Sequence, residues 1–336
     1  MRGSAVGSGR TGGKIRTAVK TAATAGLALA LAGGCTSGGA STTVAQVVVP
    51  TAQGFSSTAP PMNPPSSSQP CNPSAASMAP NTSAASGSDV AAILHKGYLT
   101  VGVAADQYLT GYLGGDGQEQ GFDIDLADAI AQSLFGNGYQ SRLRFVAIST
   151  DNRIPDLQNH VVDLVIDTMT ITCERIALVD FSAVYYNASQ RLLVQSGSGI
   201  SSLADLAGKS VCAQTGSTSI ALIQAADTSP KPHAIETTDI SDCLVLLQEG
   251  QVSAISTDDT ILAGLAKQDP NLEVVGPQLA PEPYGVAMRL GETDLQEYVN
   301  GVLAQYEADG GWQASYDRWL APSLKASTPP VAQYSH

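Results

Sequence analysis

The chain has 336 residues, which is enough for two domains of ordinary size. It carries 17 Lys and Arg against 30 Asp and Glu, a formal net charge of −13, and this acidic balance argues against nucleic-acid binding. Four scattered His and five Cys without a C-x-x-C pair argue against a metal site, so we expect neither a metal nor a cofactor.

The first 34 residues have the pattern of a secretory signal peptide. A segment with bases and no acids precedes an apolar stretch at 22–32, which is shorter than the ~20 residues that span a bilayer. A buried core helix is the alternative, but nothing at the terminus pairs with this stretch. The sequence across the end of the signal is LAGGC at 31–35, which resembles a bacterial lipobox although Ala32 stands in place of Leu. We therefore expect Cys35 to be lipidated and to hold the protein on the outer face of the cell membrane.

Residues 35–88 are expected to form a flexible tether. Residues 36–88 contain Ser, Thr, Pro, Ala and Gly in abundance and no charged residue. Such a linker has an r.m.s. reach of ~40 Å. Removal of the signal leaves 12 Lys and Arg against 30 Asp and Glu, a net charge of −18. Because this long-range field repels anions, any site for an anionic group must be local.

Export permits disulfide bonds. Beyond Cys35, the chain has Cys71 in the tether and Cys173, Cys212 and Cys243 in the folded part, and these four allow three pairings. Free buried thiols are the alternative.

Strand and helix patterns alternate between residues 89 and 320. We expect strands at 99–104, 142–147, 163–167, 191–195, 210–214, 233–236, 254–257, 272–275 and 284–289. We expect helices at 122–134, 151–160, 200–207, 218–226, 241–249, 260–268, 294–309 and 311–319. This alternation predicts α/β domains with mainly parallel sheets, in which ligands lie beyond the carboxyl ends of the strands.

Several short motifs, taken in order, resemble those of the family 3 extracellular solute-binding proteins. They are GFDIDLA at 121–127, MTITCER at 169–175, VDFS at 179–182, YY at 185–186, DLAGK at 205–209, TGST at 215–218 and YGVA at 284–287. The resemblance covers about residues 93–320. It implies the type II periplasmic-binding-protein fold, in which two α/β domains are joined by two hinge strands with the ligand cleft between them. Lobe 1 would comprise 89–192 and 285–322, lobe 2 would comprise 193–284, and 323–336 would form a tail.

Three features favour one branch of this family. They resemble the corresponding segments of the glutamate/aspartate receptors and of the actinobacterial GlnH-type lipoproteins. These features are NRIPDLQ at 152–158, STDDTILAG at 256–264, and Cys173 at a position where most members have Pro. The resemblance implies a monomeric, lipid-anchored receptor for an L-amino acid (aspartate or glutamate, with asparagine or glutamine as further candidates). Its partner would be an ABC transporter permease or a membrane signalling protein.

Arg175 follows the strand at 163–167, and its planar guanidinium suits a carboxylate. The resemblance assigns it the ligand's α-carboxylate, with Thr168 and Thr170 completing the hydrogen bonds. Thr215 and Thr218 lie in a strand-to-helix turn whose free N–H groups favour an anion, and they would contact the same carboxylate from lobe 2. A surface arginine, strand-end threonines and an ordinary helix cap are the alternatives.

The resemblance gives the ammonium group to Asp258, although the neighbouring Asp259 is an alternative partner or a helix cap. It gives the ligand's side-chain carboxylate to Arg153, which could instead be solvated or paired with Asp156. Asp106 is expected to line the lobe-1 wall, where Tyr108 and Tyr185 are either wall or core residues. Some acidic-amino-acid receptors have a His near position 240 or 241. This chain has Ile and Ser there, so an amide ligand could be admitted.

Cys212 and Cys243 both fall in the implied lobe 2, so we pair them with each other and pair Cys71 with Cys173. The enzymatic alternative on this fold is a cyclohexadienyl dehydratase using a cleft acid such as Asp106 or Asp258. The residues of the cleft are explained without turnover, and no nucleophile is paired with a base. We therefore expect a binding protein and not an enzyme.

Overall fold

The structure, a computed structural model, describes residues 71–75 and 77–335. The expected signal peptide, Cys35 and most of the expected tether lie outside these residues. Within them, no helix combines the length and the apolar character that crossing a membrane requires.

The first of two five-stranded sheets has the order β5-β1-β6-β13-β7. Its strands are β1 (Leu99–Val103), β5 (Leu143–Ala147), β6 (Leu164–Val165), β7 (Val179–Phe181) and β13 (Ala287–Arg289). A small three-stranded sheet of β2 (Asp106–Gln107), β3 (Gly111–Leu113) and β4 (Glu119–Gln120) follows β1. The helices are α1 (Asp89–Lys96), α2 (Phe122–Phe135), α3 (Arg153–Gln158), α7 (Thr293–Ala308) and α8 (Gly311–Trp319), with 3-10 turns η2 (Tyr139–Ser141) and η3 (Arg175–Ala177).

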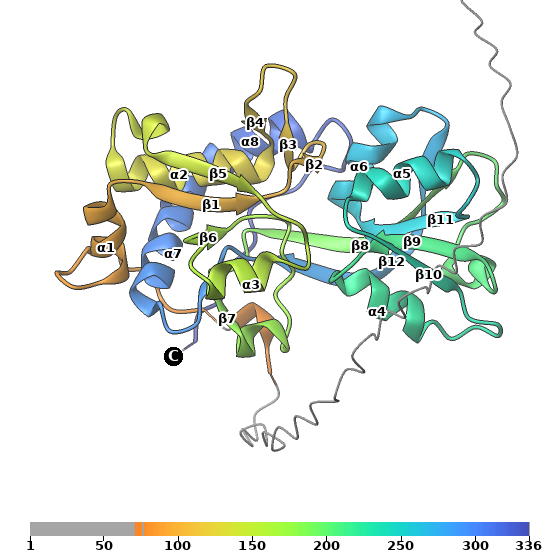
Figure 1. Ribbon diagram of the computed structural model, residues 1–336, viewed down its shortest axis with the longest axis horizontal. Helices are drawn as coiled ribbons and strands as arrows, with labels where there is room; N and C mark the ends of the chain where they lie inside the picture. Colours follow the sequence, from red (N-terminus) through yellow and green to blue (C-terminus); the bar gives the residue numbers. More distant parts are fainter. Residues whose placement is uncertain (1–70, 76, 336) are drawn as a thin grey trace, which may run out of the picture. The chain divides into compact units, whose positions relative to one another are not determined.

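The second sheet has the order β10-β9-β11-β8-β12. Its strands are β8 (Tyr186–Gln195), β9 (Ser210–Gln214), β10 (His233–Thr237), β11 (Ala254–Asp258) and β12 (Leu272–Tyr284). Helices α5 (Ile240–Gln248) and α6 (Asp259–Gln268) cover one side of it, and α4 (Thr218–Ala225) and the 3-10 turn η4 (Leu203–Leu206) cover the other (Figure 1).

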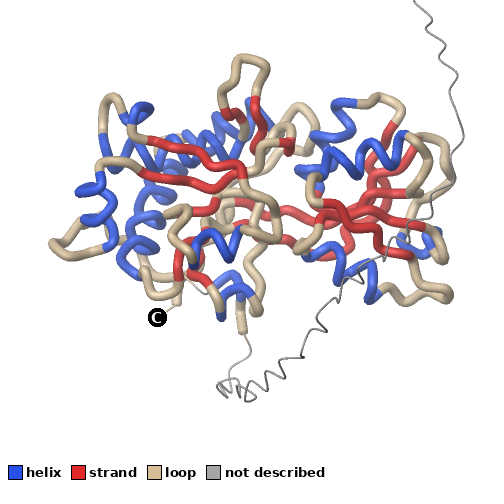
Figure 2. The backbone as a smooth tube through the Cα atoms, in the orientation of Figure 1, coloured by secondary structure: helices blue, strands red, loops and turns tan. Residues whose placement is uncertain are grey.

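Strands β8 and β12 are shared by the two halves of the fold. They pair with each other along their length, from Leu272 opposite Gln195 to Tyr284 opposite Tyr186. Both run out of the second sheet toward the first (Figures 1 and 2). Ala188 of β8 belongs to the core of the first half, whereas Leu193 belongs to a core of the second. Strands β8 and β12 therefore connect the two halves of the fold, which we call lobe 1 and lobe 2.

As predicted, the strands of each sheet are mainly parallel: four of the five run in one direction, and one runs against its neighbours, so that each sheet is mixed. In the first sheet β5, β1 and β6 are parallel, while β13 runs antiparallel to both β6 and β7. In the second sheet β10, β9 and β11 are parallel, while β8 is antiparallel to β11 and β12. Strands β8 and β12 are antiparallel because the chain leaves lobe 1 on β8 and returns on β12, in opposite directions.

Other differences are local. The strand expected at 191–195 begins at Tyr186, because the hinge extends the strand beyond the lobe-2 core. The strand expected from 272 to 275 continues to Tyr284 through an irregularity after Val275. The helix expected at 200–207 is only the 3-10 turn η4.

The end of the expected tether belongs to the folded body. Asn81 donates from its backbone N–H to the carbonyl oxygen of Glu297 in α7 at 3.0 Å. The side-chain amide of Asn300 donates to Ser77 Oγ at 2.8 Å and to the Met78 carbonyl at 2.6 Å. The expected tail also returns here, because the Ser335 N–H donates to the Ser77 carbonyl at 2.7 Å. Residues 77–81 are thus held against α7 of lobe 1, and Ser335 is held against Ser77.

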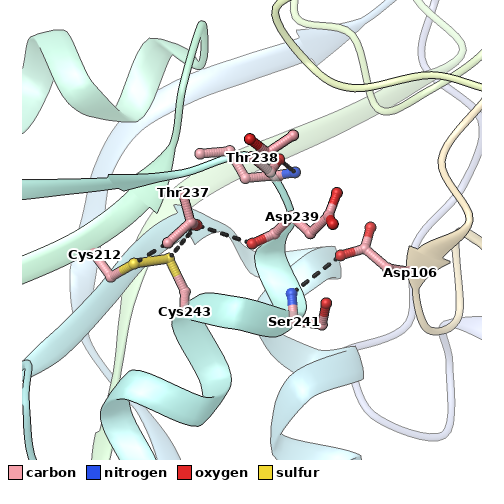
Figure 3. Close-up of a disulfide and its surroundings, with 8 residues drawn as sticks. Asp106, Cys212, Thr237, Thr238, Asp239, Ser241 and Cys243 are labelled. Carbon is pink, nitrogen blue, oxygen red and sulfur yellow. Dashed lines mark hydrogen bonds between the residues drawn. A yellow bond between two sulfur atoms is a disulfide. The ribbon is translucent and has the colours of Figure 1, made fainter. Parts of the chain in front are cut away.

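Two disulfide bonds join the cysteines in the expected pairs. Cys71 is bonded to Cys173 with a Cα–Cα distance of 6.0 Å, which fixes residues 71–75 to lobe 1. Cys212 of β9 is bonded to Cys243 of α5 with a Cα–Cα distance of 5.6 Å (Figure 3). Both sulfur atoms of the second pair are buried in the lobe-2 core.

Candidate functional site

A polar cavity of about 20 Å³ lies where the two lobes face each other beside the hinge. Lobe 1 and lobe 2 both contribute to its lining. The lining residues are Gln107, Thr150, Arg153, Thr168, Thr170, Arg175, Gln214, Ser217, Thr218, Ser219, Thr257, Asp258 and Ile261. Six of the eight expected ligand-binding residues are therefore brought together, and Thr215 and Asp106 are not.

Arg175 begins η3 and is fixed by two backbone carbonyls. One terminal nitrogen donates to the Thr170 oxygen at 2.8 Å, and the other donates to the Gly216 oxygen in lobe 2 at 3.1 Å. Burial, together with the charge of Arg153, lowers the pKa of Arg175 to about 9. The guanidinium is still a cation at neutral pH, and it is oriented before any ligand arrives.

Arg153 is the first residue of α3 and is almost fully buried, at 4% exposure. Its Nε donates to the Thr150 carbonyl at 3.0 Å, and Nη1 donates to the Asp167 carbonyl at 2.9 Å. The nearest carboxylate is that of Asp167, 3.9 Å from Nε. The alternatives of a solvated arginine and of an ion pair with Asp156 are therefore both wrong.

Thr168 is held in a strained backbone conformation, with φ of 44°. Its N–H donates to Asp123 Oδ2 at 2.8 Å, and its hydroxyl donates to Gln107 Oε1 at 3.0 Å. Tyr185 donates its hydroxyl to the other oxygen of Asp123 at 2.9 Å, so this tyrosine packs in the core and does not line the cavity. Burial raises the pKa of Asp123 to about 7. Left-handed strain in a non-glycine residue is often found at binding sites.

The lobe-2 turn after β9 presents Gln214, Ser217 and Thr218 to the cavity. Gly216 within it has φ of 77°, and a Cβ there would come within 2.8 Å of the Asp151 Cα in lobe 1. Only glycine satisfies both the backbone angle and this close approach. Thr215 does not line the cavity, because its N–H is directed to the Thr237 carbonyl at 2.9 Å, beside β10.

Asp258 supplies the lobe-2 carboxylate. It ends β11, is 5% exposed, and accepts a hydrogen bond from the Tyr284 hydroxyl at 2.7 Å. Burial, and then the charge of Glu282, raises its pKa well above the ordinary range. Asp259 does not line the cavity and instead accepts hydrogen bonds from the backbone N–H and the hydroxyl of Ser189. Of the two neighbouring aspartates, the geometry favours Asp258.

Several polar residues at the site were missed from the sequence, among them the lining residues Gln107, Thr150 and Thr257 and the neighbouring Glu282. Gln107 is 2% exposed, lines the cavity and bonds to both Thr168 and Asp167. Glu282 on β12 is 3% exposed and accepts a hydrogen bond from the Thr218 hydroxyl at 3.1 Å. Burial raises the pKa of Glu282. A signal for Glu282 was its place two residues before Tyr284 of the YGVA motif; Gln107 had none.

The structure corrects the role expected of Asp106. Its carboxylate accepts a hydrogen bond at 3.0 Å from the backbone N–H of Ser241, at the start of α5 (Figure 3). Asp106 therefore bridges the lobes at the cleft mouth and does not face the cavity. Tyr108 packs edge-on against Tyr112 and lies against the lobe-1 core. Within the described residues, no cluster of His, Cys, Asp and Glu could hold a metal ion.

Comparisons with known proteins agree with this fold and site. The family model of the bacterial extracellular solute-binding proteins, family 3, matches residues 99–322. The chain belongs to this family. The ABC transporter glutamine-binding protein GlnH of Bacillus subtilis is 36% identical over 69% of this chain and 84% of that protein. The glutamate/aspartate import solute-binding protein of Salmonella typhimurium is 28% identical over 70% of this chain and 80% of that protein.

Solved structures with a similar fold are also amino-acid-binding proteins. An ancestral arginine-binding protein bound to glutamine matches with a TM-score of 0.62 and 36% identity, over 67% of this chain and 98% of that one. The solute receptor for L-cysteine of Neisseria gonorrhoeae matches with a TM-score of 0.65 and 29% identity, over 70% of this chain and 95% of that one. This family 3 protein therefore has the type II periplasmic-binding-protein fold, and its relatives are solute-binding proteins and not enzymes.

Proposed function

We propose that this family 3 protein is an extracytoplasmic receptor that closes its two lobes on one free L-amino acid. The observation that carries the proposal is the placement of opposite charges in one cavity. Arg175 of lobe 1, which is half-buried, and Asp258 of lobe 2, which is buried, both line it and are held in place by hydrogen bonds. A free amino acid is a zwitterion, so these two groups match its two ends.

The remaining lining residues suit the backbone of such a ligand. Thr168 and Thr170 in lobe 1, and the turn with Thr218 in lobe 2, place neutral polar groups around the carboxylate end. Arg153 lies in the same cavity and would contact the side chain of the ligand. The relatives support this class of ligand, because their names specify glutamine, glutamate and aspartate, all of which share the same zwitterionic end.

Binding requires the lobes to separate and close again. A cavity of about 20 Å³ has room for roughly one water molecule, which is far less than an amino acid needs. The Arg175 to Gly216 and Asp106 to Ser241 hydrogen bonds both cross between the lobes, and both must break on opening. The ligand can shift this equilibrium only by its differential affinity for the closed form.

The anchor and the partner complete the proposal. We infer that Cys35 is lipidated and that the protein stands on the outer face of the cell membrane. There it delivers its ligand to an ABC transporter or reports it to a membrane signalling protein. Cross-linking in whole cells followed by mass spectrometry separates these two partners, and replacement of Cys35 by Ser is expected to release the protein from the membrane fraction.

A thermal-shift screen of the purified folded part, residues 71–336, against the common amino acids tests the binding function. At ligand concentrations of about 100 times Kd, the ligand stabilises the folded state by about 2.7 kcal/mol, so a positive result is a clear rise in melting temperature. If no amino acid raises the melting temperature, the protein is not an amino-acid receptor.

A further inference from the structure

Asp167 is a buried carboxylate that the binding of a zwitterion does not explain. It follows β6, is 1% exposed, and does not line the cavity. One oxygen, Oδ1, accepts a hydrogen bond from the Gln107 amide at 3.2 Å. The other, Oδ2, is buried without any hydrogen-bond partner and lies 3.9 Å from Nε of Arg153. A buried polar atom without a hydrogen-bond partner is uncommon and lowers the stability of the folded state, so its presence calls for an explanation.

The position of Asp167 couples it to the residue expected to choose the ligand's side chain. Arg153 lines the cavity, and it also donates to the backbone carbonyl of Asp167 at 2.9 Å. The carboxylate is therefore held beside the guanidinium by its own backbone and cannot move away from it. At this separation, away from water, opposite charges largely cancel each other's field.

We propose that Asp167 sets the ligand preference of this receptor by neutralising Arg153, so that the side-chain subsite takes a neutral amide in preference to a carboxylate. The proposal rests on the proposed function, since it concerns which amino acid the cavity accepts. Asp167 acts through Arg153 and is a positioning residue.

The chemistry of the two ligand side chains explains the preference. A carboxylate brought to a neutral Arg153–Asp167 pair gains little attraction and must still be desolvated. An amide oxygen can accept a hydrogen bond from Arg153 without bringing a charge into the cavity. Glutamine or asparagine is thus favoured over glutamate or aspartate, although Arg153 alone predicts the opposite.

The preference depends on pH. Burial raises the pKa of Asp167 to about 7, with the charge of Arg153 acting against this. The other charged groups that face Asp167 are Asp123 from α2, Asp106 from β2 and Arg175 from η3. Below pH 7 Asp167 takes up a proton and leaves the charge of Arg153 uncompensated. The affinity for glutamate should therefore rise relative to the affinity for glutamine as the pH falls. Above pH 7 the pair is neutral overall, and glutamine should bind more tightly than glutamate.

Titration calorimetry with glutamine and glutamate tests this proposal, using wild type, Asp167→Asn and the control Asp156→Asn at pH 5.5, 7 and 8.5. Asp156 lies on the same helix as Arg153 but forms no ion pair with it. In wild type we expect the ratio of glutamate to glutamine affinity to rise at least tenfold, about 1.4 kcal/mol, from pH 8.5 to 5.5. Asp167→Asn should show the high ratio at every pH, and Asp156→Asn should follow wild type.

The outcomes separate this inference from the function on which it rests. If wild type binds neither ligand nor any other amino acid, the proposed function fails and the inference fails with it. If both ligands bind but their ratio is the same in wild type and Asp167→Asn, the role of Asp167 is overturned and the receptor function stands. A pH dependence that persists in Asp167→Asn would assign the titration to another buried carboxylate of the site, such as Asp123, and would also overturn the proposal. Should Asp167→Asn fail to fold, the wild-type pH profile alone decides, because a flat ratio contradicts the proposal.

Discussion

The two walls of the cleft hold their charges differently. Lobe 1 contributes both arginines, Arg153 and Arg175, and fixes each through backbone carbonyls. Lobe 2 contributes Asp258, together with a turn of small polar residues. Because the cations lie on one lobe and this anion lies on the other, a zwitterion connects the lobes by its two charged ends, and a simple anion or cation lacks one of these two charge contacts. The separation of charge between lobes thus makes closure depend on the right ligand.

Replacing Arg175 should cause the largest loss of ligand affinity. Arg175→Ala removes the lobe-1 end of the connection and leaves the ligand's carboxylate buried without its cation. Loss of one partner of a buried charge pair costs about 2–5 kcal/mol, so calorimetry should show at least a thirtyfold loss of affinity for every ligand. The exposed Arg142 is the matched control, and Arg142→Ala should bind as wild type does. If the affinity of Arg175→Ala is unchanged, the ligand's carboxylate does not bind to Arg175 of lobe 1.

The equivalent change on lobe 2 is Asp258→Asn. The amide keeps the shape but loses the charge that faces the ammonium group, so we expect affinity to fall about ten- to a hundredfold for all amino acids. Asp259→Asn is the control, since Asp259 bonds to Ser189 outside the cavity. If Asp259→Asn weakens binding more than Asp258→Asn does, the assignment of the ammonium partner is reversed.

A disulfide stands behind each wall. Cys173 precedes Arg175 by two residues, and Cys212 precedes Gln214 of the lobe-2 turn by two residues. Removing the buried Cys212–Cys243 bond by a double alanine variant should lower the free energy of unfolding by about 2–4 kcal/mol, measured in denaturant. Affinity should change less, because the turn keeps its hydrogen bonds to β10. A loss of binding without a loss of stability would contradict this.

The contact at the cleft mouth should have the smallest effect. Asp106 of lobe 1 accepts a hydrogen bond from the first turn of α5 in lobe 2, and Asp106→Ala removes it. A carboxylate at a helix N-terminus contributes about 0.3–1 kcal/mol, so affinity should fall about two- to fivefold and equally for all ligands. Asp227→Ala, on an exposed loop, is the control. A change in the ratio between ligands would mean that Asp106 touches the ligand after all.

The sequence predicted most of this arrangement, and the reasons for its failures are physical. Arg175 and Asp258 could be found because each follows a buried strand within a recognisable motif, and such positions converge at one edge of a sheet. The pairing of Cys212 with Cys243 followed from their shared lobe. Asp106 also follows a strand, yet it contacts α5, because the short β2–β4 sheet turns it toward the mouth.

Other features had no local signal. Gln107 is buried by the return of the chain sixty residues later, where it meets Asp167 and Thr168. One strand is reversed in each sheet, β13 in the first and β8 in the second, and strand and helix periodicity does not encode strand direction. The stretch at 77–88 is too poor in apolar residues to predict a core segment, but its polar groups find partners on α7.

The central claim is that the two lobes each recognise one end of a zwitterion. Calorimetry of wild-type protein with glutamine, glutamine α-amide and N-acetylglutamine tests it most directly, because the side chain stays the same while one end is made neutral. We predict that glutamine binds and that each modified form loses at least about a hundredfold in affinity, or 2.7 kcal/mol. Binding of either modified form as tightly as glutamine would contradict the account.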